Sequence, residues 1–415
     1  MIIFSAVGPL YTPKIILFSI PFLPGELLGI ILSIYFLLKG VKINSFIKYF
    51  GIYTLIMCYS TFYSPLYREY SFSPEMTILA IKRILILLLF FSAFFISKNE
   101  IERLPQKILF LYSLPFIIHL GFIIINIFQG IDFSSFWSKN PKTNLTLLTY
   151  WNIIGGKLVP IGNTGTSPQL GVFSACLSLI FLSLYSQLKE KKYLLLHILF
   201  VLALIFTVSR SGLLAFIIGI IFYLSIDKTN IKYKYIFFSS ILIFCLGIFA
   251  FGFITKFGLI NRLINYGGIQ DTSSGLRIYI WSTYFLGISN NPWLLLTGIG
   301  FNSNLPSHFF SGGSLFVPGS FESLYLDAIA FGGIFCLLFL LMAWYKLFKI
   351  TEKYSQVSNI YNRSILRGIY AFIPGYFCAN FFGNSFQTDF FQSFFLIITG
   401  LIYFDIMKTT DTKKY

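Results

Sequence analysis

Long apolar runs, separated by short polar segments, constrain the fold of this chain more than any other feature. Each run approaches the roughly 20 apolar residues that a transmembrane helix needs. Only 11% of the 415 residues are charged and the mean hydropathy is +0.78, whereas soluble domains carry about 25% charged residues. The sequence therefore excludes a soluble globular enzyme and a disordered chain, and it predicts an all-α polytopic membrane protein.

Eleven runs qualify as transmembrane spans, and together they make residues 1–415 a single membrane domain. They are Ile15–Leu38, Phe46–Phe62, Met76–Ile96, Ile108–Phe128, Leu170–Leu188, Tyr193–Val208, Ser211–Ser225, Tyr235–Ile254, Ser323–Leu347, Ile369–Phe386 and Phe390–Met407. Pro21 and Pro24 interrupt the first run, so we expect it to be kinked or divided, and a divided run would give twelve spans.

Basic residues mark the predicted orientation of these spans. Short segments rich in lysine and arginine follow the first, third, fifth, seventh and ninth spans and also end the chain. The positive-inside rule places these segments, and the C-terminus, in the cytoplasm. The segment after the ninth span contains Lys346, Lys349, Lys353, Arg363 and Arg367. This arrangement accounts for the net charge of +16 without a nucleic-acid partner.

Two of the outward-facing segments are long, residues 129–169 and residues 255–322. Long loops in a compact protein are usually functional or disordered. The second loop contains a helical, aromatic stretch from Leu276 to Leu286, followed by turn residues. We therefore expect the second loop to be ordered, partly helical and part of an active site.

Arg210 lies in a short turn between two apolar runs, on the predicted outer side. An arginine at membrane depth costs about 3 kcal/mol or more, and such residues usually face the bundle interior or a wet cavity. Snorkelling of the side chain to the headgroups explains Arg210 equally well. Arg277, in the second long loop, is either a solvated loop arginine or a partner of Arg210. Two arginines side by side suit a diphosphate, because guanidinium groups grip phosphate oxygens bidentately.

Transfer of a group to a hydroxyl can use a general base. The outward candidates are Glu322, Asp327, His308 and Asp389. Glu322 opens the ninth span, where an acidic side chain also stabilises a helix N-terminus. His308 lies in a segment typical of an exposed loop, and Asp389 suits a cap or an arginine partner. The outer loops lack a dense carboxylate cluster and the cysteines form no metal motif, so the sequence predicts no metal site and no cofactor.

Two stretches resemble the bacterial O-antigen polymerase and O-antigen ligase superfamily. Thr207–Gly212 is similar to the family's T-x-S-R-x-G turn before a transmembrane helix. Ser274–Arg277, followed by Trp281 and by Asn291–Phe301, is similar to the S-G-R, W and P-x-x-G-x-G-x pattern of the family's large periplasmic loop.

Two more stretches extend the resemblance. Glu322–Leu326, followed by Gly332 and Gly333, is similar to the segment written H-N-x-x-L with a following glycine in the ligases. Gly162–Leu170 is a fainter match to a G-x-x-x-x-P-N-x-L stretch that opens a middle span. The order and spacing of the stretches agree with the family.

The resemblance implies a metal-independent membrane glycosyltransferase with a glycosyltransferase C-like helical fold. Its substrate would be an undecaprenyl-diphosphate-linked oligosaccharide, handled on the outer face of the bacterial plasma membrane. Arg210 and Arg277 match the arginines that hold the diphosphate. Glu322-Ser323 stands where the ligases have His-Asn, so the chain resembles the polymerases that build O-antigen or capsule, and the identity of the base stays open.

The resulting hypothesis is a polysaccharide polymerase. Its catalytic residues would be Arg210, Arg277 and Glu322, and further substrate contacts would come from Trp281, His308, Tyr325 and Asp389. A ligase that moves finished glycan to another acceptor stays open, as does a transporter or flippase of lipid-linked oligosaccharide, which predicts internal repeats and helices broken at mid-membrane. The expected partners are the lipid-linked oligosaccharide and membrane lipids, a chain-length regulator stays open, and no nucleic acid is expected.

Overall fold

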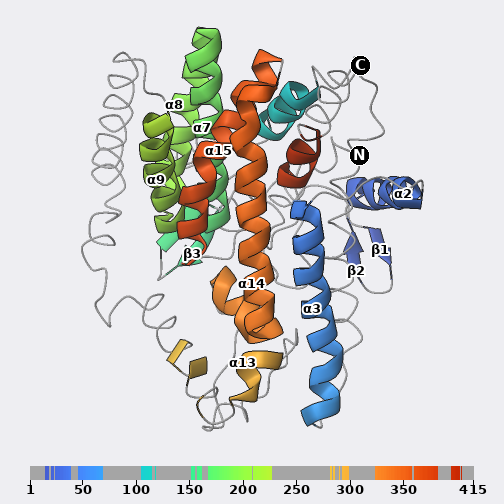
Figure 1. Ribbon diagram of the computed structural model, residues 1–415. Helices are drawn as coiled ribbons and strands as arrows, with labels where there is room; N and C mark the ends of the chain where they lie inside the picture. Colours follow the sequence, from blue (N-terminus) through green and yellow to red (C-terminus); the bar gives the residue numbers. More distant parts are fainter. Residues whose placement is uncertain are drawn as a thin grey trace.

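The computed structural model describes residues 15–17, 20–22, 24–38, 45–68, 104–114, 117, 151–154, 157–160, 167–207, 209–226, 281–282, 284–285, 289, 292–298, 323–357, 359–381, 394–401 and 403. This part of the chain is mainly helical (Figure 1). The α-helices are α2 (Pro24–Leu38), α3 (Ser45–Arg68), α7 (Ser167–Leu188), α8 (Lys191–Thr207), α9 (Arg210–Ile226), α13 (Trp293–Thr297), α14 (Leu324–Glu352) and α15 (Ile360–Ala379), and η5 (Lys353–Gln356) is a 3-10 helix. Residues 104–114 and 394–401 are also helical.

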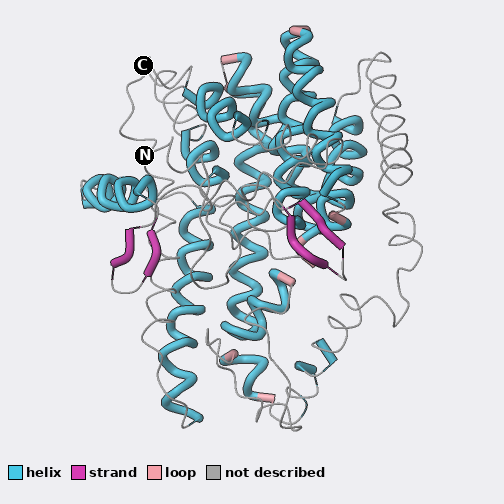
Figure 2. The backbone as a smooth tube through the Cα atoms, turned by 180° about the vertical axis from the view of Figure 1, so that it is seen from behind, coloured by secondary structure: helices cyan, strands magenta, loops and turns pink. Residues whose placement is uncertain are grey.

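Two short antiparallel hairpins accompany the helices. One pairs β1 (Ile15–Leu17) with β2 (Ile20–Phe22), and the other pairs β3 (Trp151–Ile154) with β4 (Lys157–Pro160). Figure 2 shows the first hairpin beside α2 and the second on the other side of the helices. Neither hairpin was predicted from the sequence, whereas the predicted mainly helical character is confirmed in the described residues.

The first predicted span is not one helix. The β1–β2 hairpin occupies its beginning, and α2 starts only at Pro24. Proline suits the first helical position, because its N–H would be unsatisfied there in any case and its φ is already helical. The helix α2 has 15 residues, which is short for a transmembrane span, and it lies across the direction of α3 and α14 in Figure 1.

Other predicted spans agree more closely with described helices. Helices α3, α7, α8 and α9 coincide with their spans apart from a few end residues. Two described helices are long and apolar enough to cross a membrane, Gln169–Leu188 and Leu324–Gln356. The spans Met76–Ile96 and Tyr235–Ile254 lie outside the described residues, and only parts of Ile108–Phe128 and Phe390–Met407 lie within them. The total of eleven spans therefore stays a prediction.

The boundary between the ninth and tenth predicted spans is wrong. Helix α15 begins at Ile360, well before the predicted Ile369, and it takes in Arg363 and Arg367, which were expected in a loop. The side chain of Asn359 caps this helix by accepting hydrogen bonds from the N–H groups of residues 361 and 362. The lysines of the same expected loop lie in the last turns of α14 and in η5. The helices therefore continue beyond the apolar runs from which their ends were predicted.

Helices α7, α8, α9 and α15 form one packed group, which we call the α7 group. Helix α7 is buried along nearly its whole length, with α8, α9 and α15 around it. Glycines allow the helices to approach closely, because a residue without Cβ lets two backbones touch. A Cβ on Gly368 of α15 would lie 2.5 Å from the Cα of Ile180 in α7, and one on Gly375 would meet the carbonyl of Ala215 in α9.

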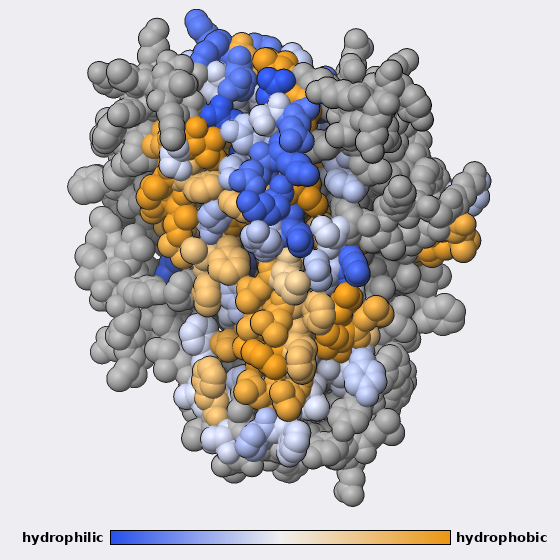
Figure 3. Space-filling model, in the orientation of Figure 1, coloured by the Kyte–Doolittle hydropathy of each residue, from blue (hydrophilic) through white to orange (hydrophobic). Residues whose placement is uncertain are grey.

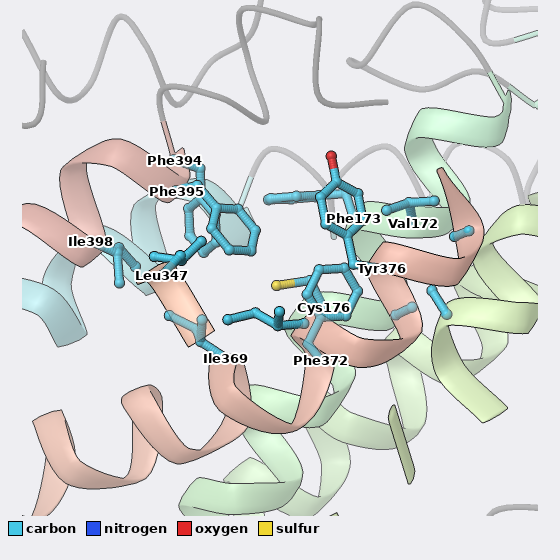
Figure 4. Close-up of a cluster of buried hydrophobic side chains, with 14 of the residues drawn as sticks. Val172, Phe173, Cys176, Leu347, Ile369, Phe372, Tyr376, Phe394, Phe395 and Ile398 are labelled. Carbon is cyan, nitrogen blue, oxygen red and sulfur yellow. The ribbon is translucent and has the colours of Figure 1, made fainter. Parts of the chain in front are cut away.

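Helices α3, α13 and α14 form a second group, which we call the α14 group. Helix α14 packs along α3 and carries α13 near its beginning. The two groups meet where α14 passes α15, and the rings of Trp344 and Tyr376 are 5.2 Å apart there. Figure 4 shows part of the shared hydrophobic core, in which Phe173 and Cys176 of α7 gather with Leu347 of α14 and with aromatic side chains of α15 and residues 394–401.

Helix α14 is broken at Gly333, although the sequence predicted one continuous span. Gly333 has φ 77° and ψ −177°, a conformation that is essentially restricted to glycine. A short first piece, Leu324 to Gly332, therefore precedes the long second piece. The adjacent glycines at 332 and 333 are the sequence signal for this break.

The connections between helices gather at two opposite ends of the bundle. Successive helices run in opposite directions, so the ends of α7, α9 and α14 and the beginnings of α8 and α15 lie together at the top of Figure 1. Hydrophilic side chains gather toward this end in Figure 3, above an apolar region. Lys192 pairs with Glu190 and Lys349 with Glu352 at this end. The beginning of α9 lies at the other end of the α7 group, and α13, with the break in α14 that it contacts, lies further down in Figure 1.

Candidate functional site

The beginnings of α7 and α9 touch at the end of the bundle opposite the basic connections. A Cβ on Gly212 would lie 2.5 Å from the carbonyl carbon of Gly171, so the two backbones are in direct contact. This contact brings together two separate sequence motifs, because Gly171 directly follows the stretch Gly162–Leu170 and Gly212 ends the stretch Thr207–Gly212. Sequence reasoning had not singled out Gly171.

Arg210 is the first residue of α9 and is half-buried. The preceding Ser209 caps the helix: its Oγ accepts a hydrogen bond from the N–H of Gly212 at 3.0 Å, and its side chain is buried. The cap fixes the backbone from which Arg210 projects. A cation at a helix N-terminus is disfavoured by about 0.3–1 kcal/mol through the helix dipole. Stabilisation of α9 therefore does not explain an arginine at this position.

Helix α15 connects the beginning of α9 with the beginning of α14. The antiparallel helices α9 and α15 touch at Ala215 and Gly375. Arg210 and Asn380 each lie five positions beyond this contact, toward the same end, which is about 7.5 Å along each helix axis. The carbonyl oxygen of Asn380 accepts hydrogen bonds from the N–H of Leu324 at 3.0 Å and from the Oγ of Ser323 at 3.4 Å.

The first turn of α14 is buried against the end of α15. The hydroxyl of Tyr325 donates a 2.6 Å hydrogen bond to the carbonyl oxygen of Phe377, and its ring centroid lies 4.5 Å from that of Phe381. Only 5% of Tyr325 is exposed, and Asp327 is fully buried two residues further on. The hydroxyl that was expected to contact substrate is thus directed to the backbone of α15.

Helix α13 packs closely against the break in α14. Gly298 ends α13 with φ 68°, and a Cβ there would lie 2.5 Å from the carbonyl oxygen of Phe331. A Cβ on Gly333 would in turn overlap the carbonyl oxygen of Leu296. The Oγ of Ser60 in α3 donates a 3.0 Å hydrogen bond to the carbonyl oxygen of Thr297. The glycines of two further motifs are therefore in backbone contact at this end of the bundle.

One segment of the chain, which includes several of these contacts, matches a known protein family. Residues 195–341 match the family model described as O-antigen ligase. This segment is therefore similar to the O-antigen ligase family. It covers about a third of the chain and contains three of the four motif stretches, including Arg210 and the break at Gly333. A search of curated proteins found no match.

The family match confirms the resemblance to the O-antigen ligase and polymerase superfamily. Members of the O-antigen ligase family are membrane-embedded, glycosyltransferase-like enzymes that act on lipid-linked oligosaccharides. The matched segment extends from α8 into the second piece of α14, so it draws on both helix groups.

Several residues predicted for the site lie outside the described part of the chain. They are Arg277, His308, Glu322 and Asp389. The pairing of Arg210 with Arg277 therefore stays a prediction. Trp281 is half-buried and packs against the hydrophobic core. Among the residues that the structure describes, no three His, Cys, Asp or Glu side chains converge as a metal site would require.

Sequence reasoning missed the residues of α15 that connect the motifs. Gly375 supports α9, while Phe377 and Asn380 accept hydrogen bonds from the first turn of α14. The signal in the sequence was weak. Gly375 follows Pro374 within an apolar run, and Asn380 is a polar residue where the tenth span was expected to continue.

Proposed function

We propose that this protein is a polysaccharide polymerase that extends a glycan carried on undecaprenyl diphosphate. The observation that carries the proposal is a series of contacts that links the O-antigen ligase motifs on the side of the bundle away from the basic connections. Contacts between glycines and the hydrogen bond at Asn380 connect α9, which begins at Arg210, through α15 to the beginning of α14, and connect α14 to α13.

The proposed reaction transfers the growing chain to the incoming repeat unit. A hydroxyl of the incoming lipid-linked unit attacks the anomeric carbon of the growing chain, and a new glycosidic bond forms. The bond between that carbon and the diphosphate oxygen breaks, and undecaprenyl diphosphate leaves with the electron pair. Arg210 and Arg277 stabilise the charge on the leaving diphosphate, as fixed cations do without reorganisation. Glu322 takes the proton of the attacking hydroxyl.

The acidic residue at position 322 favours a polymerase over a ligase. The ligases carry His-Asn where this chain has Glu322-Ser323. A ligase that hands finished glycan to another acceptor is the second candidate, because the matching family is described as O-antigen ligase.

A transporter is less suited to these contacts. Transporters place broken helices near the middle of the membrane, at the interface of repeats. Helix α14 is broken, but its break at Gly333 packs against α13 rather than against a second, repeated helix pair among the described residues. This arrangement suits a fixed site at one surface.

The test is a surface-glycan gel of cells that carry Arg210→Ala. A polymerase predicts that the ladder collapses to a single repeat unit, while a ligase predicts loss of all attached repeats and a flippase predicts units trapped inside the cell. Arg363→Ala is the matched control, because Arg363 is also half-buried but donates its Nε–H to the carbonyl of Val357 at the opposite end. An unchanged ladder with normal amounts of Arg210→Ala protein would overturn the proposal.

A further inference from the structure

We infer that Tyr325 is a positioning residue, whose hydrogen bond to α15 holds the first turn of α14, which directly follows Glu322-Ser323 in the sequence, in place relative to Arg210. The inference rests on the proposed function, and it gives Tyr325 a role other than contact with the sugar. Tyr325 acts through the backbone of Phe377, to which its hydroxyl donates.

The two parts of the proposed site belong to different helix groups. Arg210 begins α9 in the α7 group, whereas Glu322 directly precedes the first turn of α14 in the α14 group. Helix α14 makes its extensive contacts with α3 and far fewer with α15. The position of the first turn of α14 relative to Arg210 therefore depends on how this turn is attached to α15.

Three hydrogen bonds make this attachment, which we call the clasp. The N–H of Leu324 and the Oγ of Ser323 bond to the carbonyl of Asn380, and the hydroxyl of Tyr325 bonds to the carbonyl of Phe377. The side chains of the clasp are buried, so water does not compete for these bonds. A buried carbonyl left without its donor is costly, which makes the geometry well defined.

The clasp joins two helix ends that need partners. The last carbonyls of a helix and its first N–H groups have no partner within the helix. At the end of α15, the N–H of Phe381 bonds to the carbonyl of Cys378 rather than to that of Phe377. The hydroxyl of Tyr325 fills the position that this shift leaves open. The carbonyl of Asn380 likewise satisfies the first N–H of α14.

The chain offers a matched control for the loss of one buried tyrosine hydroxyl. Tyr223 of α9 is also buried, and its hydroxyl donates a 2.7 Å hydrogen bond to the Oγ of Ser186 in α7. This bond lies toward the opposite end of the bundle, within the α7 group. Tyr223→Phe and Tyr325→Phe therefore each remove one hydrogen bond of a buried tyrosine hydroxyl, but only Tyr325→Phe loosens the clasp.

The experiment uses the full chain in lipid nanodiscs with a lipid-linked repeat unit as substrate, and it compares thermal midpoint, kcat and KM. We expect both tyrosine variants to lose similar stability. Tyr325→Phe should lower kcat about tenfold or more with little change in KM, since small displacements of reacting groups cost large factors in rate. Tyr223→Phe should leave both constants near those of the unchanged protein.

Three results would overturn the inference: an unchanged kcat in Tyr325→Phe, an equal loss of kcat in Tyr223→Phe, or a rise in KM alone, which would indicate direct contact with the sugar. If Tyr325→Phe does not fold, Ser323→Ala removes a longer bond of the same clasp and should lower kcat in the same way. Arg210→Ala distinguishes a failure of the proposed function from a failure of the inference about Tyr325. If Arg210→Ala retains full activity, the proposed function is wrong. If Arg210→Ala loses activity while Tyr325→Phe keeps a normal kcat, only the role of the clasp is refuted.

Discussion

Gly212 of α9 lies against Gly171 of α7 so closely that a Cβ on Gly212 would come within 2.5 Å of the Gly171 carbonyl carbon. Arg210 is the first residue of α9 and lies two positions before Gly212 in the sequence. The contact at Gly212 therefore also fixes the backbone near Arg210. The glycine of the T-x-S-R-x-G motif is thus explained by packing, while the arginine beside it is not.

The substitution Gly212→Ala should therefore separate α7 from α9 and displace Arg210. We expect a destabilisation of about 1–3 kcal/mol, the usual cost of overpacking, together with a shortened glycan ladder. Thermal unfolding in detergent and the surface-glycan gel measure the two effects. Gly51→Ala in α3 is the control, because no atom lies within 4 Å of its new Cβ, and it should be neutral or slightly stabilising. Equal behaviour of the two variants would contradict the packing argument.

Gly333→Ala should be more damaging than Gly212→Ala. The new methyl group would overlap the carbonyl oxygen of Leu296, and alanine is strained at φ 77°. Backbone strain of this kind costs on the order of 1–3 kcal/mol before the overlap is counted. We expect α13 to detach from α14, which limited proteolysis near residues 293–297 would detect as faster cleavage. Protection equal to that of the unchanged protein would show that the break is not required for docking of α13.

Removal of the cap of α9 should affect the site without changing any charge. Ser209→Ala loses the hydrogen bond from the N–H of Gly212, and we expect a cost of about 1 kcal/mol and reduced polymerisation. Ser209→Thr keeps a capping oxygen and should retain most of both properties. The midpoint of thermal unfolding and the length of the glycan ladder are measured for both variants. A Ser209→Ala variant with a normal midpoint would show that the cap does not stabilise α9.

Chelation of divalent cations should leave the proposed polymerisation unchanged. The leaving diphosphate is assigned to the fixed cations Arg210 and Arg277, which need no metal. Rates measured in nanodiscs with excess EDTA should equal those measured with magnesium. If EDTA greatly lowered the rate and magnesium restored it, a bound cation and not the arginines would stabilise the leaving diphosphate.

Hydropathy predicted helices best where one helix equals one apolar run, as in α7 and α8. It failed where backbone chemistry decides the boundary. The cap at Asn359 starts α15 early, and Gly333 divides a run that is apolar on both sides. Pro24 begins α2, and only the prolines, not the hydropathy, had indicated that the first run is kinked or divided. Hydropathy contains no signal for these features because each depends on φ, on a missing N–H or on a capping oxygen.

The motif residues were recognisable one by one, but their arrangement was not. Gly212, Gly298 and Gly333 stood out in the sequence, yet nothing there indicated that Gly298 faces Phe331 or that Gly212 faces Gly171. Such pairings depend on which helices become neighbours, and a single sequence does not contain that information. The role of α15 was missed for the same reason, since Phe377 and Asn380 act through their carbonyl groups rather than through a recognisable side chain.

A helix divided at Gly333 cannot act as a piston. The backbone leaves helical φ and ψ at this glycine, so the two pieces of α14 do not form one straight rod. The short piece instead moves with α13 and with the end of α15, to which it is bonded. The first turn of α14, with the buried side chains of Tyr325 and Asp327, is therefore anchored by its neighbours α13 and α15 and not by the long piece of its own helix.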